Sequence, residues 1–252
     1  MKIILVGYGR MGKAVESAAL RRSHSITAKV DPAAEDAGVV RTLTPDLLKN
    51  ADAVIEFALP QGIEANAELY AKTGVPAVIG TTGWDDRRKA IADLVTRSNG
   101  TALWGNNFSV GAHLLFKLTA EISRLTEKLP DYDIMIHEFH HKMKKDSPSG
   151  TALTLAEKVL ENNRRKTVIQ TQTLDRAIKP EELHVVGIRG GFLPGTHTVT
   201  VDGPCDTVEL THTARSRDGF ALGAVMAAEW LIGKKGFFRV EDFIDDLFKK
   251  EL

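Results

Sequence analysis

Histidine and lysine side chains are concentrated in one short segment, residues 137–145, which reads HEFHHKMKK. An imidazole can donate or accept a proton near neutral pH, and a lysine ammonium can bind an anion. His140 and Lys144 therefore form a candidate pair for proton transfer to an anionic substrate, while Lys142 and Lys145 add positive charge. Taken alone, the segment is also compatible with a solvated basic loop that carries an incidental histidine pair.

The same letters match the H-E-x-x-H pattern of zinc hydrolases, in which two histidines one helical turn apart share a metal. Residues 132–138, however, alternate apolar and polar side chains, which is the period of a strand. On a strand His137 and His141 would be about 13 Å apart, too far to share one ion. Pro148 also interrupts any long motif helix. We therefore expect no metal, and metal analysis would detect the zinc hydrolase alternative.

A helix is predicted to begin directly after this segment, over about 151–161. Ser149 or Thr151 can serve as its N-cap, and the free backbone amides at Gly150 and Thr151 can hold a carboxylate. Capping alone would explain the serine and threonine. We predict that Ser149, Gly150 and Thr151 belong to the substrate site, together with His141.

A glycine motif near the N-terminus indicates a second kind of site. The sequence GYGRMG follows the apolar run 3–6 and opens a helix, and Asp31 ends the next strand 19 residues beyond Gly12. In the dinucleotide-binding fingerprint Gly7 allows the tight turn, Gly9 lets the pyrophosphate approach, and Gly12 allows close packing of the helix on the strand. Asp31 would accept a hydrogen bond from the ribose 2′-hydroxyl and repel a 2′-phosphate, so NADH is expected to bind at least as well as NADPH.

Two further segments follow presumed parallel strands, where open sheets of this kind bind ligands. They read GTTG from Gly80 and GNNF from Gly105, although a plain turn would explain either one. Arg10 or Lys13 could reach a phosphate, or could simply be solvated. The predicted cofactor-binding residues are Gly7, Tyr8, Gly9, Arg10, Met11, Gly12, Asp31, Gly80, Thr81, Thr82, Gly105, Asn106, Asn107 and Phe108.

The elements that must position these residues fall into two groups. Strands and helices alternate up to about residue 104, which predicts a Rossmann-like, doubly wound parallel sheet. After a long helix over about 111–129, strands predominate at 132–138, 167–173, 183–188, 196–202 and 206–213. They predict a central α+β domain with a mixed, mostly antiparallel sheet. The overall class is therefore α/β, with a dinucleotide-binding domain from 1–109 and 218–252 and a substrate-binding and oligomerisation domain from 110–217.

Composition restricts the partners and the compartment. The 33 basic and 33 acidic side chains cancel, so no global field favours nucleic acid or an anionic membrane. The single cysteine, Cys205, cannot form an internal disulfide, and no apolar run approaches the roughly 20 residues of a membrane-spanning helix. We expect a cytoplasmic protein that acts on a small molecule.

These residues also carry a resemblance to a known family. The segment EFHHKMKKDSPSGTA, from Glu138 to Ala152, resembles the E-x-H-H-x-x-K-x-D-x-P-S-G-T-A signature of the dihydrodipicolinate (4-hydroxy-tetrahydrodipicolinate) reductases of lysine and diaminopimelate biosynthesis. GYGRMG, VIGTTGW and NNFSVG resemble segments of the same family in the same order. The likeness covers essentially the whole chain.

The resemblance implies an NAD(P)H-dependent reduction of 4-hydroxy-tetrahydrodipicolinate, a small heterocyclic dicarboxylate, to tetrahydrodipicolinate with loss of water. It implies His140 and Lys144 as the catalytic pair, His141 and Gly150-Thr151 as substrate contacts, and a homotetramer joined through the central sheets. Two departures stand out. Pro32 occupies a position that is often arginine, and Glu56-Phe57-Ala58 replaces a DFT-like strand end.

Two other functions remain open at this point. A two-domain NAD(P)-dependent reductase of a semialdehyde or a sugar would share the first domain but not the segment from Glu138 to Ala152. A nicotinamide-sensing protein would bind NADH without turnover.

Overall fold

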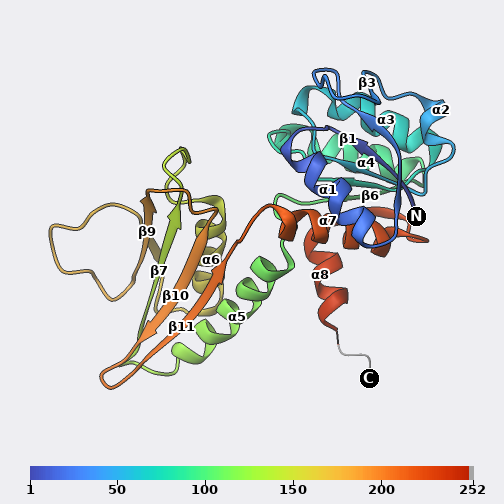
Figure 1. The fold of residues 1–252 in the computed structure, drawn as a ribbon. Helices are drawn as coiled ribbons and strands as arrows, with labels where there is room; N and C mark the ends of the chain where they lie inside the picture. Colours follow the sequence, from blue (N-terminus) through green and yellow to red (C-terminus); the bar gives the residue numbers. More distant parts are fainter. Residues whose placement is uncertain (250–252) are drawn as a thin grey trace. The chain divides into compact units, whose positions relative to one another are not determined.

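A computed structural model describes residues 1–249, which divide into two compact units. The first unit combines Met1–Val110 with the chain from Arg217 onward, and the second is Gly111–Ser216 (Figure 1). The chain therefore leaves the first unit once and returns to it once.

A seven-stranded sheet in the order β12-β6-β5-β4-β1-β2-β3 forms the centre of the first unit, and every pairing in it is parallel. Its strands are β1 (Lys2–Val6), β2 (Ser25–Val30), β3 (Val39–Val40), β4 (Ala53–Glu56), β5 (Ala77–Ile79), β6 (Thr101–Trp104) and β12 (Gly236–Arg239). The predicted Rossmann-like parallel sheet is confirmed. The short edge strands β3 and β12 were not predicted, because two to four residues carry too little periodicity.

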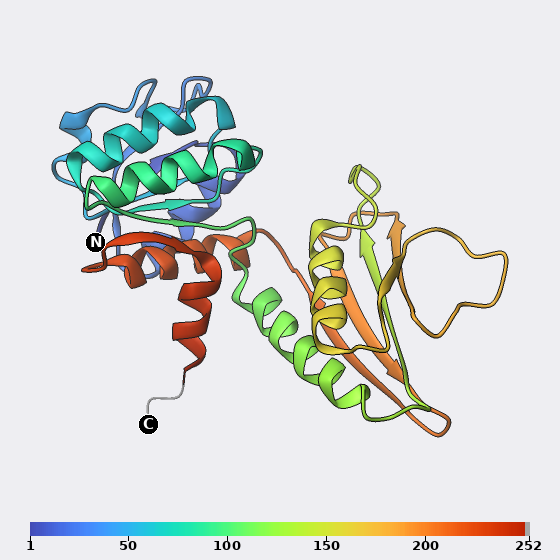
Figure 2. The same cartoon turned by 180° about the vertical axis from the view of Figure 1, so that it is seen from behind.

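Helices cover both faces of this sheet (Figure 2). One core contains α1 (Arg10–Arg21), α7 (Asp218–Leu231) and α8 (Val240–Phe248). The other contains α2 (Pro45–Leu48), α3 (Ile63–Thr73) and α4 (Arg88–Arg97), with the 3₁₀ turns Pro60–Gly62 and Asp85–Arg87 at the starts of α3 and α4. The continuous apolar run in β1 follows from this arrangement, because a strand covered on both faces has no solvated side.

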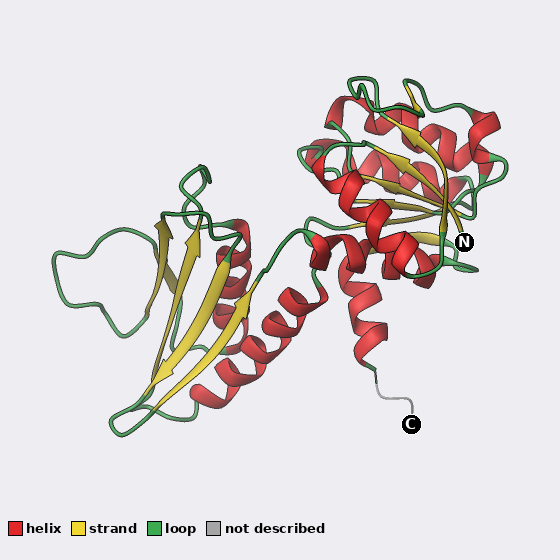
Figure 3. Ribbon diagram, viewed as in Figure 1, coloured by secondary structure: helices red, strands yellow, loops and turns green. Residues whose placement is uncertain are grey.

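The second unit contains a five-stranded sheet in the order β11-β10-β7-β9-β8 (Figure 3). Its strands are β7 (Asp133–His140), β8 (Val168–Gln170), β9 (Glu182–Arg189), β10 (Thr196–Asp202) and β11 (Thr207–Thr213), and its helices are α5 (Val110–Thr126) and α6 (Gly150–Asn162). The pairs β10–β11 and β10–β7 are antiparallel, whereas β7–β9 and β8–β9 are parallel. The predicted mixed sheet is confirmed, and its parallel half arises because α6 lies on the connection that leads from β7 to its parallel partner.

Strand β7 alternates strictly between a buried and a more exposed face. Ile134 and Ile136 pack under α5 and α6, and Glu138 and His140 continue the same buried face. Because side chains two residues apart on a strand point the same way, Glu138 and His140 lie next to each other on the helix-covered side. The strand assignment also removes the helical geometry that H-E-x-x-H requires.

Candidate active site

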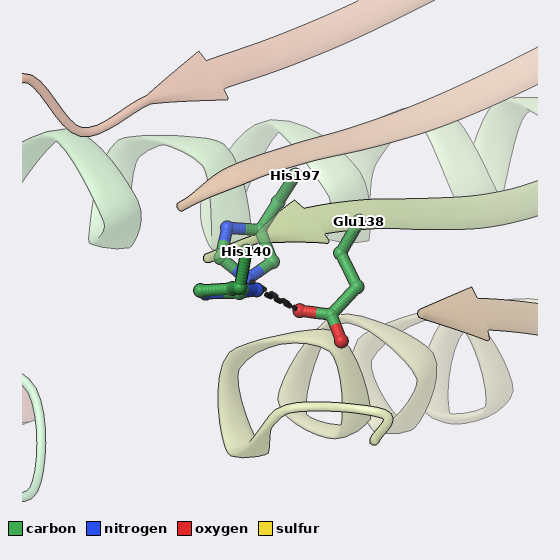
Figure 4. A group of neighbouring side chains, drawn as sticks. All are labelled: Glu138, His140 and His197. Carbon is green, nitrogen blue, oxygen red and sulfur yellow. Dashed lines mark ion pairs between the residues drawn. The ribbon is translucent and has the colours of Figure 1, made fainter. Parts of the chain in front are cut away.

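Three buried side chains from two neighbouring strands converge on the helix-covered face of the second unit (Figure 4). Glu138 and His140 come from β7, and His197 comes from β10, directly opposite Glu138 in the register. The Nδ1 atom of His140 lies 2.7 Å from Oε2 of Glu138, and Nε2 of His197 lies 3.4 Å from the same oxygen. A single carboxylate oxygen therefore faces two imidazoles.

The other oxygen of Glu138 is held by two donors. Oε1 accepts a 2.8 Å hydrogen bond from the backbone N–H of Ser149 and a 2.7 Å bond from Nη2 of Arg189. Burial by itself would raise the pKa of the Glu138 carboxyl, but hydrogen bonds from His197, Ser149 and Arg189 outweigh it and hold that pKa well below its usual range. Glu138 is therefore a buried permanent anion.

Burial has the opposite consequence for His140. Removal from water lowers the pKa of its imidazole to about 4, because the nearby charge of Glu138 opposes this shift only in part, while His197, Lys144 and Arg189 add to it. The close Nδ1–Oε2 contact lacks hydrogen-bond alignment, so it is an electrostatic contact rather than an ideal hydrogen bond. At neutral pH the ring is mostly uncharged.

Lys144 lies close enough to His140 to act on its pKa, so the fold brings together the two predicted catalytic side chains. A turn positions it, since the Lys144 N–H donates to the carbonyl of His141 at 3.1 Å. The Lys144 ammonium lies 2.9 Å from the carboxylate of Asp146. His141 itself is tied to a neighbouring loop through a 2.9 Å bond from its N–H to the Leu193 carbonyl.

The start of α6 meets this cluster through Ser149. The Ser149 hydroxyl caps the helix by accepting from the N–H of Ala152 at 3.2 Å, and it also lies 3.1 Å from Nε2 of His197. The predicted substrate residue Ser149 is thus buried and already engaged within the fold. Gly150 and Thr151 form the first turn, whose backbone amides have no helical acceptor and remain available to an anion.

Glu138, His140 and His197 also have the donor types of a metal site, with ligand atoms within 4.8 Å of one another. The guanidinium of Arg189, 2.7 Å from Glu138, is a competing permanent cation, and it already occupies one oxygen of the only carboxylate in the group. The surroundings therefore favour an organic acid–base cluster over a divalent ion.

Each glycine of the motif in the first unit lies in a different backbone environment. Gly7 has a φ of +87°, and a Cβ there would lie 2.2 Å from the Phe57 carbonyl oxygen. A Cβ on Gly12 would lie 2.2 Å from the Gly7 carbonyl, whereas one on Gly9 would meet nothing within 4 Å. Open space before Gly9, at the start of α1, is the geometry that a dinucleotide pyrophosphate needs.

Asp31 lies beside this turn. Its carboxylate accepts hydrogen bonds from the N–H groups of Tyr8 at 2.8 Å and Ala33 at 2.9 Å. Partial burial would raise the pKa of Asp31, but backbone hydrogen bonds including these two outweigh it and lower that pKa. Arg41 reaches the same corner, where Nη1 donates to the Pro32 carbonyl at 3.0 Å. A cation is therefore present near Asp31 despite the proline at position 32.

The remaining predicted cofactor residues divide into exposed and buried ones. The phenol of Tyr8 pairs with Glu16 and Lys29, the Thr81 hydroxyl accepts from Ala58, and Phe108 packs edge-on against Phe57, so these three side chains serve the core. Gly80 and Gly105 allow close packing against Phe57 and Val240. The Asn107 side chain accepts from the Ser109 N–H at 2.9 Å.

Thr82 and Asn106 line a cavity of about 990 Å³ in the first unit, together with Trp84, Arg88 and Trp104. Arg10 and Met11 form the first turn of α1.

Three residues of these sites were missed by reasoning from the sequence. Arg189, His197 and Arg41 belong to no motif. Arg189 and His197 are distant along the chain from Glu138 and Ser149, which they contact, whereas Arg41 meets the Pro32 carbonyl across a short loop. Strand pairing and loop packing place these residues in the sites. The polarity of a single residue does not predict such long-range contacts. An arginine or histidine at an inward position of an apolar strand was the one available hint.

A doubly wound parallel sheet, a glycine turn of the dinucleotide-binding type and a buried histidine cluster beside a lysine are typical of an NAD(P)H-dependent oxidoreductase. The chain belongs to the dihydrodipicolinate reductase family. The family model for the N-terminus of dihydrodipicolinate reductase matches residues 1–108, and the model for its C-terminus matches residues 111–244. The resemblance inferred from the sequence is thereby confirmed.

Individual relatives agree with this assignment. The chain is 39% identical to a 4-hydroxy-tetrahydrodipicolinate reductase of Christiangramia forsetii, over 99% of this chain and 100% of the relative. It is 37% identical to one of Archaeoglobus fulgidus, over 94% and 96% of the two chains. A dipicolinate-bound dihydrodipicolinate reductase from Paenisporosarcina shares the fold, with a TM-score of 0.75, 21% identity and coverage of 95% and 97%. Within the described residues no helix is long and apolar enough to cross a membrane.

Proposed function

We propose that this protein reduces 4-hydroxy-tetrahydrodipicolinate to tetrahydrodipicolinate, with NAD(P)H as reductant and loss of water, in cytoplasmic lysine and diaminopimelate synthesis. The observation that carries the proposal is the cluster of Glu138, His140 and Lys144 beside the open first turn of α6. It combines a proton donor, a cation and an anion-binding helix start, which are the groups that a ring with two carboxylates requires.

The side chains have separate tasks in this reaction. The 4-hydroxyl first leaves as water, together with a proton from the adjacent ring carbon, which gives an unsaturated ring imine. The reduced nicotinamide, when bound, would supply hydride to C4 of that imine. Electron density then moves towards C3, where His140 delivers a proton. Lys144 exchanges Asp146 for a substrate carboxylate and stabilises the developing negative charge, and the amides of Gly150 and Thr151 hold a carboxylate of the substrate. Lys144 is the alternative proton donor, since its ammonium is also an acid.

His140 needs the substrate in order to become charged. Without it the imidazole is mostly neutral at pH 7, because burial lowers its pKa to about 4. Two substrate carboxylates close to the ring favour the imidazolium and raise that pKa towards neutrality. The acid therefore forms in the substrate complex, which limits unproductive proton exchange in the free enzyme.

The cofactor preference follows from the corner around Asp31. The ionised carboxylate favours the ribose 2′-hydroxyl and repels a 2′-phosphate. NADH is therefore at least as good a substrate as NADPH. The guanidinium of Arg41 lies close enough to offset part of the repulsion, so NADPH is also accepted.

A homotetramer is proposed through the uncovered face of the second sheet. That face carries partly exposed apolar side chains on two adjacent central strands, including Met135 on β7 and Ile188 on β9. Apolar side chains on an open sheet face are typical of subunit contacts. Sedimentation equilibrium of the parent and of Ile188→Glu tests this, and a monomeric parent would refute it.

One assay decides the proposed reaction. The unstable substrate is generated in the cuvette from pyruvate and aspartate semialdehyde by its synthase, and reduced-nicotinamide absorbance is followed. Oxidation that depends on both precursors supports the proposal. Oxidation without either precursor, or none with both, refutes it and returns the semialdehyde reductase and the nicotinamide sensor to consideration.

A further inference from the structure

We infer that Glu138 is the positioning residue of this site: its buried carboxylate fixes the proton of the neutral His140 ring on Nδ1 and leaves Nε2 as the atom that exchanges protons with substrate. The inference rests on the proposed function, since it concerns how His140 performs the proton transfer assigned to it. Glu138 itself touches neither substrate nor cofactor in this scheme.

The His140 ring and the Glu138 carboxylate are in close contact. Nδ1 of His140 lies 2.7 Å from Oε2 of Glu138. Two unprotonated acceptor atoms repel each other at that separation, so one of them carries a proton. The carboxyl of Glu138 is held ionised by its other partners, and the proton therefore resides on the ring. The neutral imidazole is the Nδ1–H tautomer, with a bare Nε2.

The carboxylate of Glu138 cannot rotate freely, because other donors hold it. Its Oε1 atom accepts hydrogen bonds from the Ser149 N–H at 2.8 Å and from Nη2 of Arg189 at 2.7 Å. A backbone N–H and a guanidinium can only donate, so the atom at this position must be an acceptor. Oε2 is therefore always presented to the two imidazoles.

The opposite edge of the His140 ring faces Gly195. A Cβ on Gly195 would lie 2.8 Å from Nε2 of His140, and Gly195 has a φ of +152°, where side chains are rarely accommodated. The backbone thus keeps a side chain away from Nε2. The titratable and charged groups that face the ring are Glu138, His197, Lys144 and Arg189, of which only Glu138 is acidic.

The variant Glu138→Gln tests whether Glu138 determines the tautomer of His140. Because the two donors at Oε1 select the amide oxygen, the amide NH₂ must take the place of Oε2 and point at His140. An N–H of the amide then lies against Nδ1, where a second proton is unfavourable, so the proton of the neutral ring moves to Nε2. The imidazolium is disfavoured as well, since its Nδ1–H would meet the NH₂ group.

The experiment measures tautomer and turnover in the same proteins. Nitrogen-15 spectra of histidine-labelled protein at pH 7 should report Nδ1–H for His140 in the parent and Nε2–H in Glu138→Gln. The kcat should fall about 100-fold, with KM changing less than about threefold. In Glu138→Asp, which keeps the charge, kcat should recover about tenfold relative to Glu138→Gln.

The pH profile is the second readout. Loss of the neighbouring anion should move the alkaline limb of kcat for Glu138→Gln to lower pH by about one unit, whereas Glu138→Asp should keep the parental limb. A purely structural role would lower the amount of folded protein without moving this limb or the tautomer.

Glu182→Gln is the matched control. Glu182 is a buried carboxylate of the same sheet, paired with Arg176 at 2.7 Å, and it lies about 23 Å along β9 from Arg189. Its variant should keep the parental tautomer, kcat and pH profile. Equal losses in Glu182→Gln and Glu138→Gln, in proportion to their stability, would overturn the inference.

Further outcomes separate this inference from the proposed reaction. An Nε2–H tautomer in the parent overturns the positioning role even if no variant folds. Parental kcat and pH profile in a folded Glu138→Gln, while His140→Gln is inactive, also overturn it and leave the proposed function intact. If the parent itself shows no precursor-dependent oxidation, the proposed function fails, yet the tautomer comparison still reports on Glu138.

Discussion

The phenol of Tyr70 donates a 2.7 Å hydrogen bond to Oε2 of Glu56, and both side chains are buried beneath α3 at the end of β4. Asn66 donates to the other oxygen of Glu56 at 3.2 Å. Burial raises the pKa of Glu56 from 4.5 to about 7, although hydrogen bonds from Tyr70, Asn66 and Thr81 oppose the shift. A protonatable carboxyl is therefore part of the core of the dinucleotide-binding unit.

The pKa of Glu56 predicts that stability declines towards alkaline pH. The folded state holds a proton that the unfolded chain releases above pH 4.5, so this contribution is complete below 4.5 and is lost as pH rises through about 7. Glu56→Gln stays neutral and should exceed the parent in free energy of unfolding by about 2 kcal/mol at pH 8, with little difference at pH 4.5. Urea denaturation at both pH values measures this. Glu68→Gln, at an exposed position of α3, should show no such difference. Equal pH dependence in the parent and Glu56→Gln would contradict the prediction.

The lowered pKa of His140 predicts that stability declines towards acidic pH. The unfolded histidine protonates near 6.5 and the folded one only at about 4, so stability is lost as pH falls between these values. Between pH 6.5 and 4, the free energy of unfolding should therefore fall by about 2 to 3 kcal/mol less in His140→Gln than in the parent. Chemical denaturation across this window gives the comparison. His137→Gln, on the other face of β7, should follow the parental curve, and a parallel decline in His140→Gln would disprove the assignment.

Lys144 is predicted to act on the bound substrate. Lys144→Met should lower kcat/KM by about 100-fold to 1000-fold, because the carboxylate and the developing charge lose their cation. The dissociation constant for NADH, measured by fluorescence titration, should not change. Asp146→Asn removes the carboxylate that Lys144 contacts at 2.9 Å and should lower the substrate KM about threefold. Exposed Lys145→Met is the control; if it lost as much activity as Lys144→Met, general positive potential would explain both.

Arg41 is predicted to support NADPH selectively. Arg41→Ala should raise the KM for NADPH about tenfold, since one charge-assisted contact to the 2′-phosphate is lost, and leave the KM for NADH within about twofold. Steady-state kinetics with both cofactors measure the ratio. Equal changes for the two cofactors would show that Arg41 only braces the loop through the Pro32 carbonyl.

Part of this structure depends only on short-range interactions and can therefore be predicted from the amino-acid sequence. The glycine turn before α1 is readable because a φ of +87° at Gly7 and a 2.2 Å approach at Gly12 exclude side chains whatever the rest of the chain does. The period of two in β7 is equally local, and it places Glu138 and His140 on one face whichever strands pair with β7. His140 and Lys144, the proposed acid–base pair, are four residues apart in the sequence, so their proximity needs no long-range contact.

Other features depend on packing between distant segments. His197 meets Glu138 only because β10 pairs with β7 in one particular register, and Arg189 arrives through the parallel pairing of β9. Reversing either pairing would keep every local preference and remove the cluster. The roles of Ser149, Tyr8 and Phe108 were also decided in three dimensions, because burial engages side chains that the motifs alone would have offered to a ligand. The sequence by itself therefore determined which chemical groups are available, and tertiary structure decided which are buried, which are charged and which face one another.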